Sequence, residues 1–141
     1  MINDFHGKNF FLDNFFPSPM KIDGKIYATN EHFFQANKAT TEEGHEKIRK
    51  AKSPGDAKMK GQVVDLVKDW EEIKLGVMKR GLEVKFSNKK LRKKLLKTGN
   101  QELIEGNTWH DTTWGVCNGV GKNWLGKLLM ALREDLRKTN D

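Results

Sequence analysis

Aromatic and polar positions follow a helical period between Asn30 and Ala39. Bulky aromatic residues occupy one side of the predicted helix. Glu31, Gln35 and Lys38, at positions i, i+4 and i+7, share the other side over about two turns. A carboxylate, an amide and an ammonium in this arrangement either line a pocket for a polar ligand or form a solvated helix face. The pattern alone leaves both interpretations open.

Start and stop signals predict the neighbouring elements. Asp23-Gly24 between apolar positions indicates a hairpin with a short strand through Ile26 and Tyr27, and Thr29 or Asn30 can cap the helix that follows. Three more helix starts are expected downstream. They are Thr40-x-x-Glu43, with a helix through Ile48; Ser53-Pro54-Gly55-Asp56; and Asp69-x-x-Glu72, with Trp70, Ile73, Val77 and Met78 facing inward.

A basic segment follows at residues 85–97, with many lysines and no acidic residue. Leu91, Leu95 and Leu96 give it the apolar stripe of a helix that ends at Thr98-Gly99. The lysines form either a solvated face or a surface that meets phosphate groups.

The last third of the chain combines an irregular stretch with a final helix. Leu103 and Ile104 are expected to form a strand, and Asn123 to cap the helix. Its buried stripe is predicted to comprise Leu125, Leu128, Leu129, Leu132 and Leu136. The loop Gly106–Lys122 is long for a domain of this size, and such loops are often functional. The pattern as a whole predicts a compact, helix-rich α+β fold with a few short strands.

Composition narrows the class of protein. The chain has 141 residues, which fits a single domain over residues 1–141. Hydrophobic residues at 36% and charged residues at 32% are typical of a globular protein rather than a disordered one. The net charge of +7 favours anionic partners such as phosphates, nucleotides or nucleic acid.

Cysteine usage and hydropathy indicate the compartment. Cys117 is the only cysteine, so an intramolecular disulfide is impossible, which agrees with a reducing environment. The N-terminus carries no signal-peptide pattern, and no apolar run approaches the ~20 residues that a membrane span needs. We therefore expect a cytoplasmic protein without a membrane partner. The oligomeric state stays open.

Common cofactor and metal motifs are absent or incomplete. The segment 121–128 nearly matches a P-loop but lacks the Ser or Thr that holds magnesium, and the loop glycines do not fit GxGxxG. The four histidines form no HExxH pair, so neither a metal nor a cofactor is expected. Cys117 is either a structural cysteine or, with a histidine, a nucleophile.

The loop carries a second candidate group, Asp111-Thr112-Thr113-Trp114-Gly115. An aspartate close to a tryptophan suits a site that stacks on a base and holds sugar hydroxyls. The alternatives are that Asp111 is a turn residue and Trp114 a core residue. Gly115 and Gly121 either permit close approach to a ligand or only shape the loop.

Several blocks occur in a specific order over nearly the whole chain. They are Asn14-Phe15-Phe16-Pro17-Ser18-Pro19, Tyr27-x-x-x-Glu31-His32-Phe33-Phe34-Gln35-Ala36-x-Lys38-Ala39, Ser53-Pro54-x-x-Ala57-Lys58, Asp69-Trp70, Leu95-Leu96-x-Thr98-Gly99, Asp111-x-x-Trp114-Gly115 and Gly121-x-Asn123-Trp124-Leu125-Gly126. In this order they resemble the NADAR family, also called YbiA-like.

The resemblance implies hydrolysis of an N-glycosidic bond. It implies as substrate either a phosphorylated ribosylamino-pyrimidine of riboflavin synthesis or ADP-ribose attached to a guanine base, with ADP-ribosylated nucleic acid as a further partner. The alternative is a non-catalytic module that binds ADP-ribose, nucleotides or nucleic acid.

Cleavage of a ribose C1′–N bond builds positive charge on the sugar, and the leaving nitrogen needs a proton. Glu31 and Asp111 are the candidate carboxylates, with exchangeable roles in orienting the ribose and activating water. Lys38 is the third candidate catalytic residue, either as a cation or as a nucleophile that forms a Schiff base. The expected binding residues are Asn14, Phe15, Gln35, Trp114, Gly115, Gly121 and Asn123.

Overall fold

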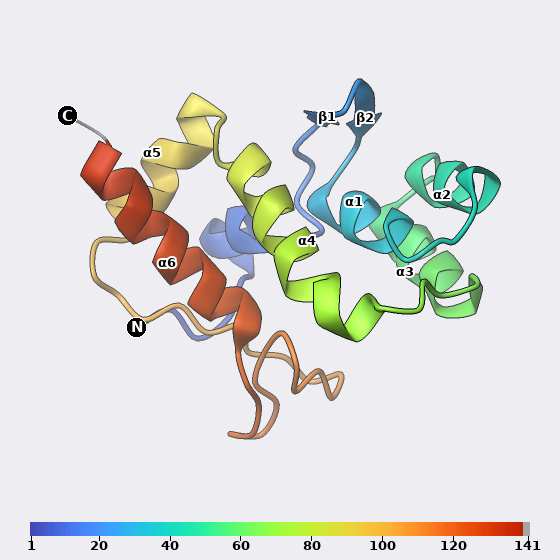
Figure 1. Cartoon of the computed structure of the whole chain (residues 1–141). Coiled ribbons are helices and arrows are strands. Elements are labelled where there is room, and N and C mark those ends of the chain that lie inside the picture. The colour runs from blue at the N-terminus through green and yellow to red at the C-terminus, as the bar shows by residue number, and fades with distance from the viewer. Residues whose placement is uncertain (140–141) are drawn as a thin grey trace. The chain divides into compact units, whose positions relative to one another are not determined.

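The computed structural model describes residues 1–139, which divide into two units. One unit is Asn14–Lys85, and the other combines Met1–Asp13 with Phe86–Asp141. Figure 1 shows the elements in chain order. Helices dominate both units, and the sheet found in the described residues has two strands, which confirms the predicted helix-rich α+β class. That residues 1–141 form a single domain stays a prediction.

The unit Asn14–Lys85 begins with the predicted hairpin. Strands β1 (Met20–Ile22) and β2 (Lys25–Tyr27) pair antiparallel, with Met20 opposite Tyr27. Asp23 and Gly24 between them have φ angles of 51° and 81°. Positive φ at both central residues is the geometry of a tight hairpin turn, which an Asp-Gly pair adopts at low cost.

Helix α1 (Asn30–Ala36) packs against three other helices of this unit (Figure 1). These are α2 (Glu42–Arg49), α3 (Pro54–Val63) and α4 (Trp70–Lys85). The shared core comprises Met20, Ile22, Tyr27, Phe33, Ala36, Ile48 and Ala57. Because α1 is covered by these neighbours, all its side chains are buried.

Helix caps explain most of the boundaries in this unit. Thr29 and Ser53 accept hydrogen bonds from His32 N and Asp56 N, as predicted for α1 and α3. The predicted cap of α2 was wrong by one residue. Thr41, not Thr40, accepts from Gly44 N, and two glutamates in the following turn favour this start.

The second unit is built from η1 (Gly7–Leu12), α5 (Lys89–Lys97) and α6 (Trp124–Thr139). Helices α5 and α6 pack together, and buried Arg133 donates from Nη1 to Thr98 Oγ1 at 2.9 Å. Gly99 ends α5 with φ +65°, as expected for a glycine after a helix. Leu125 and Leu129 are buried, whereas the other predicted stripe leucines of α6 are half-buried.

Two predictions, on the basic segment and on residues 103 and 104, need correction. The basic segment is not one helix, because Asn88 caps a new helix and Lys85 is a buried residue at the end of α4. The predicted strand at Leu103 and Ile104 is only an isolated bridge between Leu103 and Ile2. Within residues 1–139, no helix has the length and apolar character needed to cross a bilayer.

Candidate active site

Glu31 lies in the first turn of α1, where its backbone N–H donates to Asn14 O at 3.1 Å. Its side chain is buried, with 7% of the residue exposed, and Gln35 one turn later is 4% exposed. The alternative of a solvated helix face is therefore wrong for these two residues. A buried carboxylate needs hydrogen-bond partners to offset the loss of water.

Gln35 supplies such a partner. Its Nε2 donates to Glu31 Oε2 at 2.7 Å, across one helical turn. The predicted i, i+4 neighbours thus form a carboxylate–amide pair inside the protein rather than at its surface. This pair fixes one carboxylate oxygen of Glu31 toward Gln35.

Lys38 is not on the helix, contrary to the predicted i+7 position. Helix α1 ends at Ala36, and the Asn37 side chain donates back to Phe33 O at 2.7 Å. Lys38 instead lies in the turn that follows, where its carbonyl accepts from Val67 N at 2.9 Å. The adjacent bridge between Ala39 and Leu66 pairs this turn with the segment before α4. Lys38 is therefore positioned by backbone pairing.

The Lys38 ammonium lies beside a pair of adjoining aromatic rings. Its Nζ is 5.8 Å from the ring centroid of Phe34 and 5.8 Å from that of Trp70, and these rings are 5.0 Å apart. Burial lowers the pKa of Lys38 from its usual 10.5, while the Glu31 charge opposes this shift. The Glu31 charge therefore acts on the Lys38 ammonium. That the two side chains line one substrate site stays a prediction.

Trp70 was missed as a site residue. The sequence marked it only as an inward-facing residue at the start of a helix. It is buried beside Lys38, which lies over thirty residues earlier in the chain. No local pattern connects the two positions, although the Asp69-Trp70 block in the family resemblance was an available signal.

Asn14 supports the start of α1. Its Oδ1 accepts from Asn30 Nδ2 at 2.8 Å, and its own Nδ2 lies 3.4 Å from Met78 Sδ. The Asn14 amide is therefore bonded within the protein, and its neighbour Phe15 is half-buried. A role for Asn14 and Phe15 in binding a substrate stays a prediction.

The second candidate group lies in the loop of the other unit. Asp111 Oδ1 accepts from Thr113 N at 3.1 Å and from Trp114 N at 2.9 Å. This is the geometry of an Asx turn, so Asp111 acts as a turn residue, which was the structural alternative. Asn107 holds the same loop, because its amide bonds both the N–H and the carbonyl of Asp111. A catalytic role for Asp111 stays a prediction.

Glu105 is a buried carboxylate that the sequence reasoning did not identify. Its Oε2 accepts from Asn107 Nδ2 at 2.9 Å. A Cβ atom at Gly115 would lie 1.7 Å from this oxygen, and one at Gly121 would lie 2.1 Å from Gly115 O. Both glycines are therefore needed for close packing of the loop. Their role toward a ligand stays a prediction.

We expect Gly115→Ala to lower the free energy of unfolding by about 1–3 kcal/mol, the usual cost of forcing extra atoms into a packed site. Gly76→Ala on α4 is the matched control, because nothing lies within 4 Å of its added Cβ. It should be neutral or slightly stabilising. Denaturant unfolding of both variants measures the difference. Equal stabilities would contradict the tight packing of Glu105 against Gly115.

Asn123 directly precedes α6, but its described side-chain bonds leave the helix. Its Oδ1 accepts from Glu105 N, and its Nδ2 donates to Leu103 O, both at 3.0 Å. Asn123 thus ties the start of α6 to residues 103–105, in place of the predicted cap bond. Trp114 is half-buried, so its burial does not decide between a pocket residue and a core residue.

The histidines and Cys117 were also candidates for chemistry. His32 is held by Thr29 Oγ1 at 2.8 Å and Ala51 O at 3.0 Å, which makes it a structural residue of α1. Cys117 is a buried free thiol. In the part of the chain that the structure describes, no group of three or more His, Cys, Asp or Glu side chains could hold a metal ion.

The predicted site residues fall into two sets. Asn14, Phe15, Glu31, Gln35 and Lys38 belong to the unit Asn14–Lys85, and the remaining candidates belong to the loop and helix start of the other unit. Within the first set a hydrogen bond joins Glu31 with Gln35, and the Glu31 charge acts on Lys38. That both sets contribute to one site stays a prediction.

Comparisons with known proteins test the family resemblance. The family model described as the NADAR domain matches residues 2–137. The N-glycosidase YbiA of Shigella boydii is 45% identical over 129 residues, which is 89% of this chain and 80% of that protein. The NMR structure of Escherichia coli YbiA superimposes with a TM-score of 0.88 at 37% identity, covering 99% of this chain and 89% of the other.

A more distant relative carries a pathway in its name. The riboflavin biosynthesis protein VVA0006 of Vibrio vulnificus is 33% identical over 132 residues, which is 91% of this chain and 36% of that protein. These matches confirm the resemblance to the NADAR family. The relatives named N-glycosidases belong to the predicted enzyme class, the hydrolases of N-glycosyl bonds. The chain belongs to the NADAR domain family.

Proposed function

We propose that this protein hydrolyses the ribose C1′–N bond of a phosphorylated ribosylamino-pyrimidine, an intermediate of riboflavin synthesis. The names of the relatives support the reaction class and the pathway. The structural observation that carries the proposal is the buried Glu31 carboxylate. It is held by Gln35 at 2.7 Å and coupled to the half-buried Lys38.

The chemistry places charge where these residues can act. As the C1′–N bond breaks, its electron pair moves to the leaving nitrogen and positive charge grows on the ribose. The Glu31 carboxylate stabilises this charge and orients the water that adds to C1′. The leaving nitrogen takes a proton, and the products are a free ribose phosphate and the amino-pyrimidine. In the proposal, Asp111 assists from the loop.

Lys38 has two possible roles in this scheme. As an ammonium, it holds the substrate phosphate or donates to the departing nitrogen. As a neutral amine, it attacks C1 of the ring-opened sugar, displaces the pyrimidine amine and forms a Schiff base. Water then hydrolyses the Schiff base and releases the sugar. Burial lowers the pKa of Lys38, which favours the amine form more than free water would. The Phe34 and Trp70 rings, each 5.8 Å from Nζ, attract the ammonium form.

The fold alone does not separate an enzyme from a binding module. The test is incubation of the protein with the ribosylamino-pyrimidine phosphate, with NAD and with DNA carrying ADP-ribose on guanine. Released base is then detected by mass spectrometry. Release from the pyrimidine substrate alone supports the proposal. Tight binding without release from any of the three favours the non-catalytic alternative.

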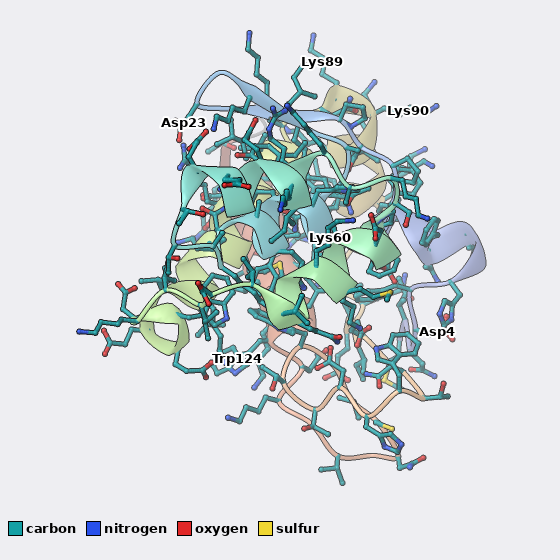
Figure 2. The ribbon with its side chains drawn as sticks, turned by 90° about the vertical axis from the view of Figure 1, so that its right-hand side faces the viewer. Asp4, Asp23, Lys60, Lys89, Lys90 and Trp124 are labelled. Carbon is teal, nitrogen blue, oxygen red and sulfur yellow. The ribbon has the colours of Figure 1, made fainter. Side chains whose placement is uncertain are left out.

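A specific observation favours a second candidate substrate, ADP-ribosylated nucleic acid, which release of base from the modified DNA would identify. Helix α5 exposes Lys89, Lys90, Lys93, Lys94 and Lys97, and contains no acidic residue. Figure 2 shows Lys89 and Lys90 extending outward from this helix. The Lys94 Nζ lies 5.5 Å from the Phe11 ring centroid. Such a lysine surface suits a chain of phosphates.

Lys93→Ala is expected to raise the KM for a DNA substrate. The slope of log KM against log salt concentration should fall by about one, because one phosphate contact is lost. Exposed Lys79→Ala on α4 removes the same charge elsewhere and is the control. Release of base measured at several salt concentrations gives both slopes. If the two variants show the same slope as the wild type, the α5 lysines are only a solvated face.

A further inference from the structure

Gly61 of α3 lies directly against the side chain of Gln35. A Cβ atom at this position would be 2.0 Å from Gln35 Oε1, 2.9 Å from Cδ and 3.3 Å from Cβ. Gly61 is buried, and its backbone is helical. The amide of Gln35 therefore occupies the space that any side chain at position 61 would fill.

The Gln35 amide is held from only one of its two ends by a hydrogen bond. Nε2 donates to Glu31 Oε2, whereas Oε1 has no hydrogen-bond partner among the described residues. An unpaired buried amide oxygen is costly. No second hydrogen bond within the described part of the chain fixes the Gln35 amide at its Oε1 end. The Gln35 amide is instead confined at this end by packing against the backbone of Gly61, which has no side chain in the way.

We propose that Gly61 is a positioning residue for Glu31 and acts through Gln35. The inference rests on the proposed function, in which the Glu31 carboxylate carries the chemistry. A side chain at position 61 would push the amide away from Oε2. Glu31 would then lose a hydrogen bond that orients Oε2 and stabilises the ionised carboxylate.

Two other helix glycines provide matched controls. Gly55, on the same helix, has no atom closer than 3.9 Å to its added Cβ. Gly81 of α4 faces a comparable obstruction, because its Cβ would lie 1.9 Å from Asn30 Oδ1. The Asn30 amide, however, donates to Asn14 and Met78. Gly81→Ala thus reproduces the packing defect against α1 without acting on Gln35.

The experiment is a double-mutant cycle with Gly61→Ala, Gln35→Ala and the pair combined. Turnover of the ribosylamino-pyrimidine phosphate is measured against pH. We expect each single variant to lower kcat about 10-fold or more, with KM changed less than about 3-fold. In the plot of kcat against pH, the rise on the acid side should move to higher pH. Because the Gln35→Ala chain has no amide to displace, Gly61→Ala should add almost nothing in that background.

The controls separate positioning from packing. Gly55→Ala should match the wild type in rate and melting temperature. Gly81→Ala should lower the melting temperature but leave the rise of kcat on the acid side in place. If Gly61→Ala alone fails to fold, the double variant should recover folding, since the obstructing side chain is shortened. Failure of the double variant to fold would overturn the proposal.

Other outcomes also decide the matter. Additive losses of kcat in the double-mutant cycle would overturn the role of Gly61. The same conclusion would follow if Gln35→Ala, or folded Gly61→Ala, kept the kcat and the pH profile of the wild type. Absence of turnover by the wild-type protein would instead overturn the proposed function itself, whereas a fully active Glu31→Gln protein would overturn only the role of Glu31. The assay of the wild-type protein therefore distinguishes failure of the proposed function from failure of the inference about Gly61.

Discussion

Glu31→Gln is expected to lower kcat at least ~100-fold while the protein stays folded. The glutamine keeps the size of the side chain and an oxygen that can accept from Gln35 Nε2, so the buried pair survives. It removes the negative charge that stabilises the sugar cation. Base release followed by mass spectrometry measures kcat, and circular dichroism with thermal melting monitors the fold.

Glu43→Gln is the matched control. Glu43 is exposed on α2, and its carboxylate is 3.7 Å from Lys47 Nζ, an arrangement that contributes little to stability. It should leave kcat unchanged. A folded Glu31→Gln protein with near-normal turnover would refute the assignment of Glu31 as the carboxylate of the reaction.

Local chemistry explains which parts of the fold the sequence predicted. The Asp23-Gly24 turn, the caps at Thr29 and Ser53 and the stop at Gly99 each depend on residues within a few positions. Their backbone geometry follows from side-chain hydrogen bonds and from glycine's access to positive φ. Such features are readable without knowing how the helices pack.

Packing between distant segments explains what the sequence did not predict. A helix with Glu31 and Gln35 on one side has the pattern of a half-exposed helix, yet three helices cover α1. Lys85 lies in a lysine-rich segment but is 1% exposed at the end of α4. Burial of this kind depends on which surfaces meet, which local periodicity does not encode.

The candidate site shows the same division. The sequence identified Glu31, Gln35 and Lys38, because their types and spacing suit the chemistry. It did not identify Trp70 beside Lys38 or Gly61 beside Gln35, since these partners lie 32 and 26 residues away by their numbers. Tertiary contacts thus supply the surroundings that determine how each predicted group behaves.

Lys38→Met is expected to lower kcat at least ~100-fold, with a melting temperature equal to or above that of the wild type. Burial lowers the pKa of Lys38 below 10.5, so the charged form is disfavoured in the folded protein. The unfolded chain binds the proton more tightly, and stability therefore rises with pH through the window between the folded pKa and 10.5. At neutral pH the methionine removes a cost and keeps contact with the aromatic rings.

Exposed Lys79→Met is the control for the loss of one positive charge, and it should retain normal turnover. Loss of activity with undiminished stability would identify Lys38 as a residue kept for chemistry rather than for folding. Turnover by Lys38→Met at the wild-type rate would exclude Lys38 from the reaction.

The pH profile and chemical trapping distinguish the two roles of Lys38. An ammonium that holds phosphate or donates a proton is lost as pH rises through the lowered pKa, so kcat should fall over that window. A neutral nucleophile gains over the same window, and kcat should rise. Borohydride added during turnover should then leave a reduced sugar adduct on Lys38 in the wild type. A rising profile with that adduct requires the covalent route, whereas a falling profile without one requires direct attack by water.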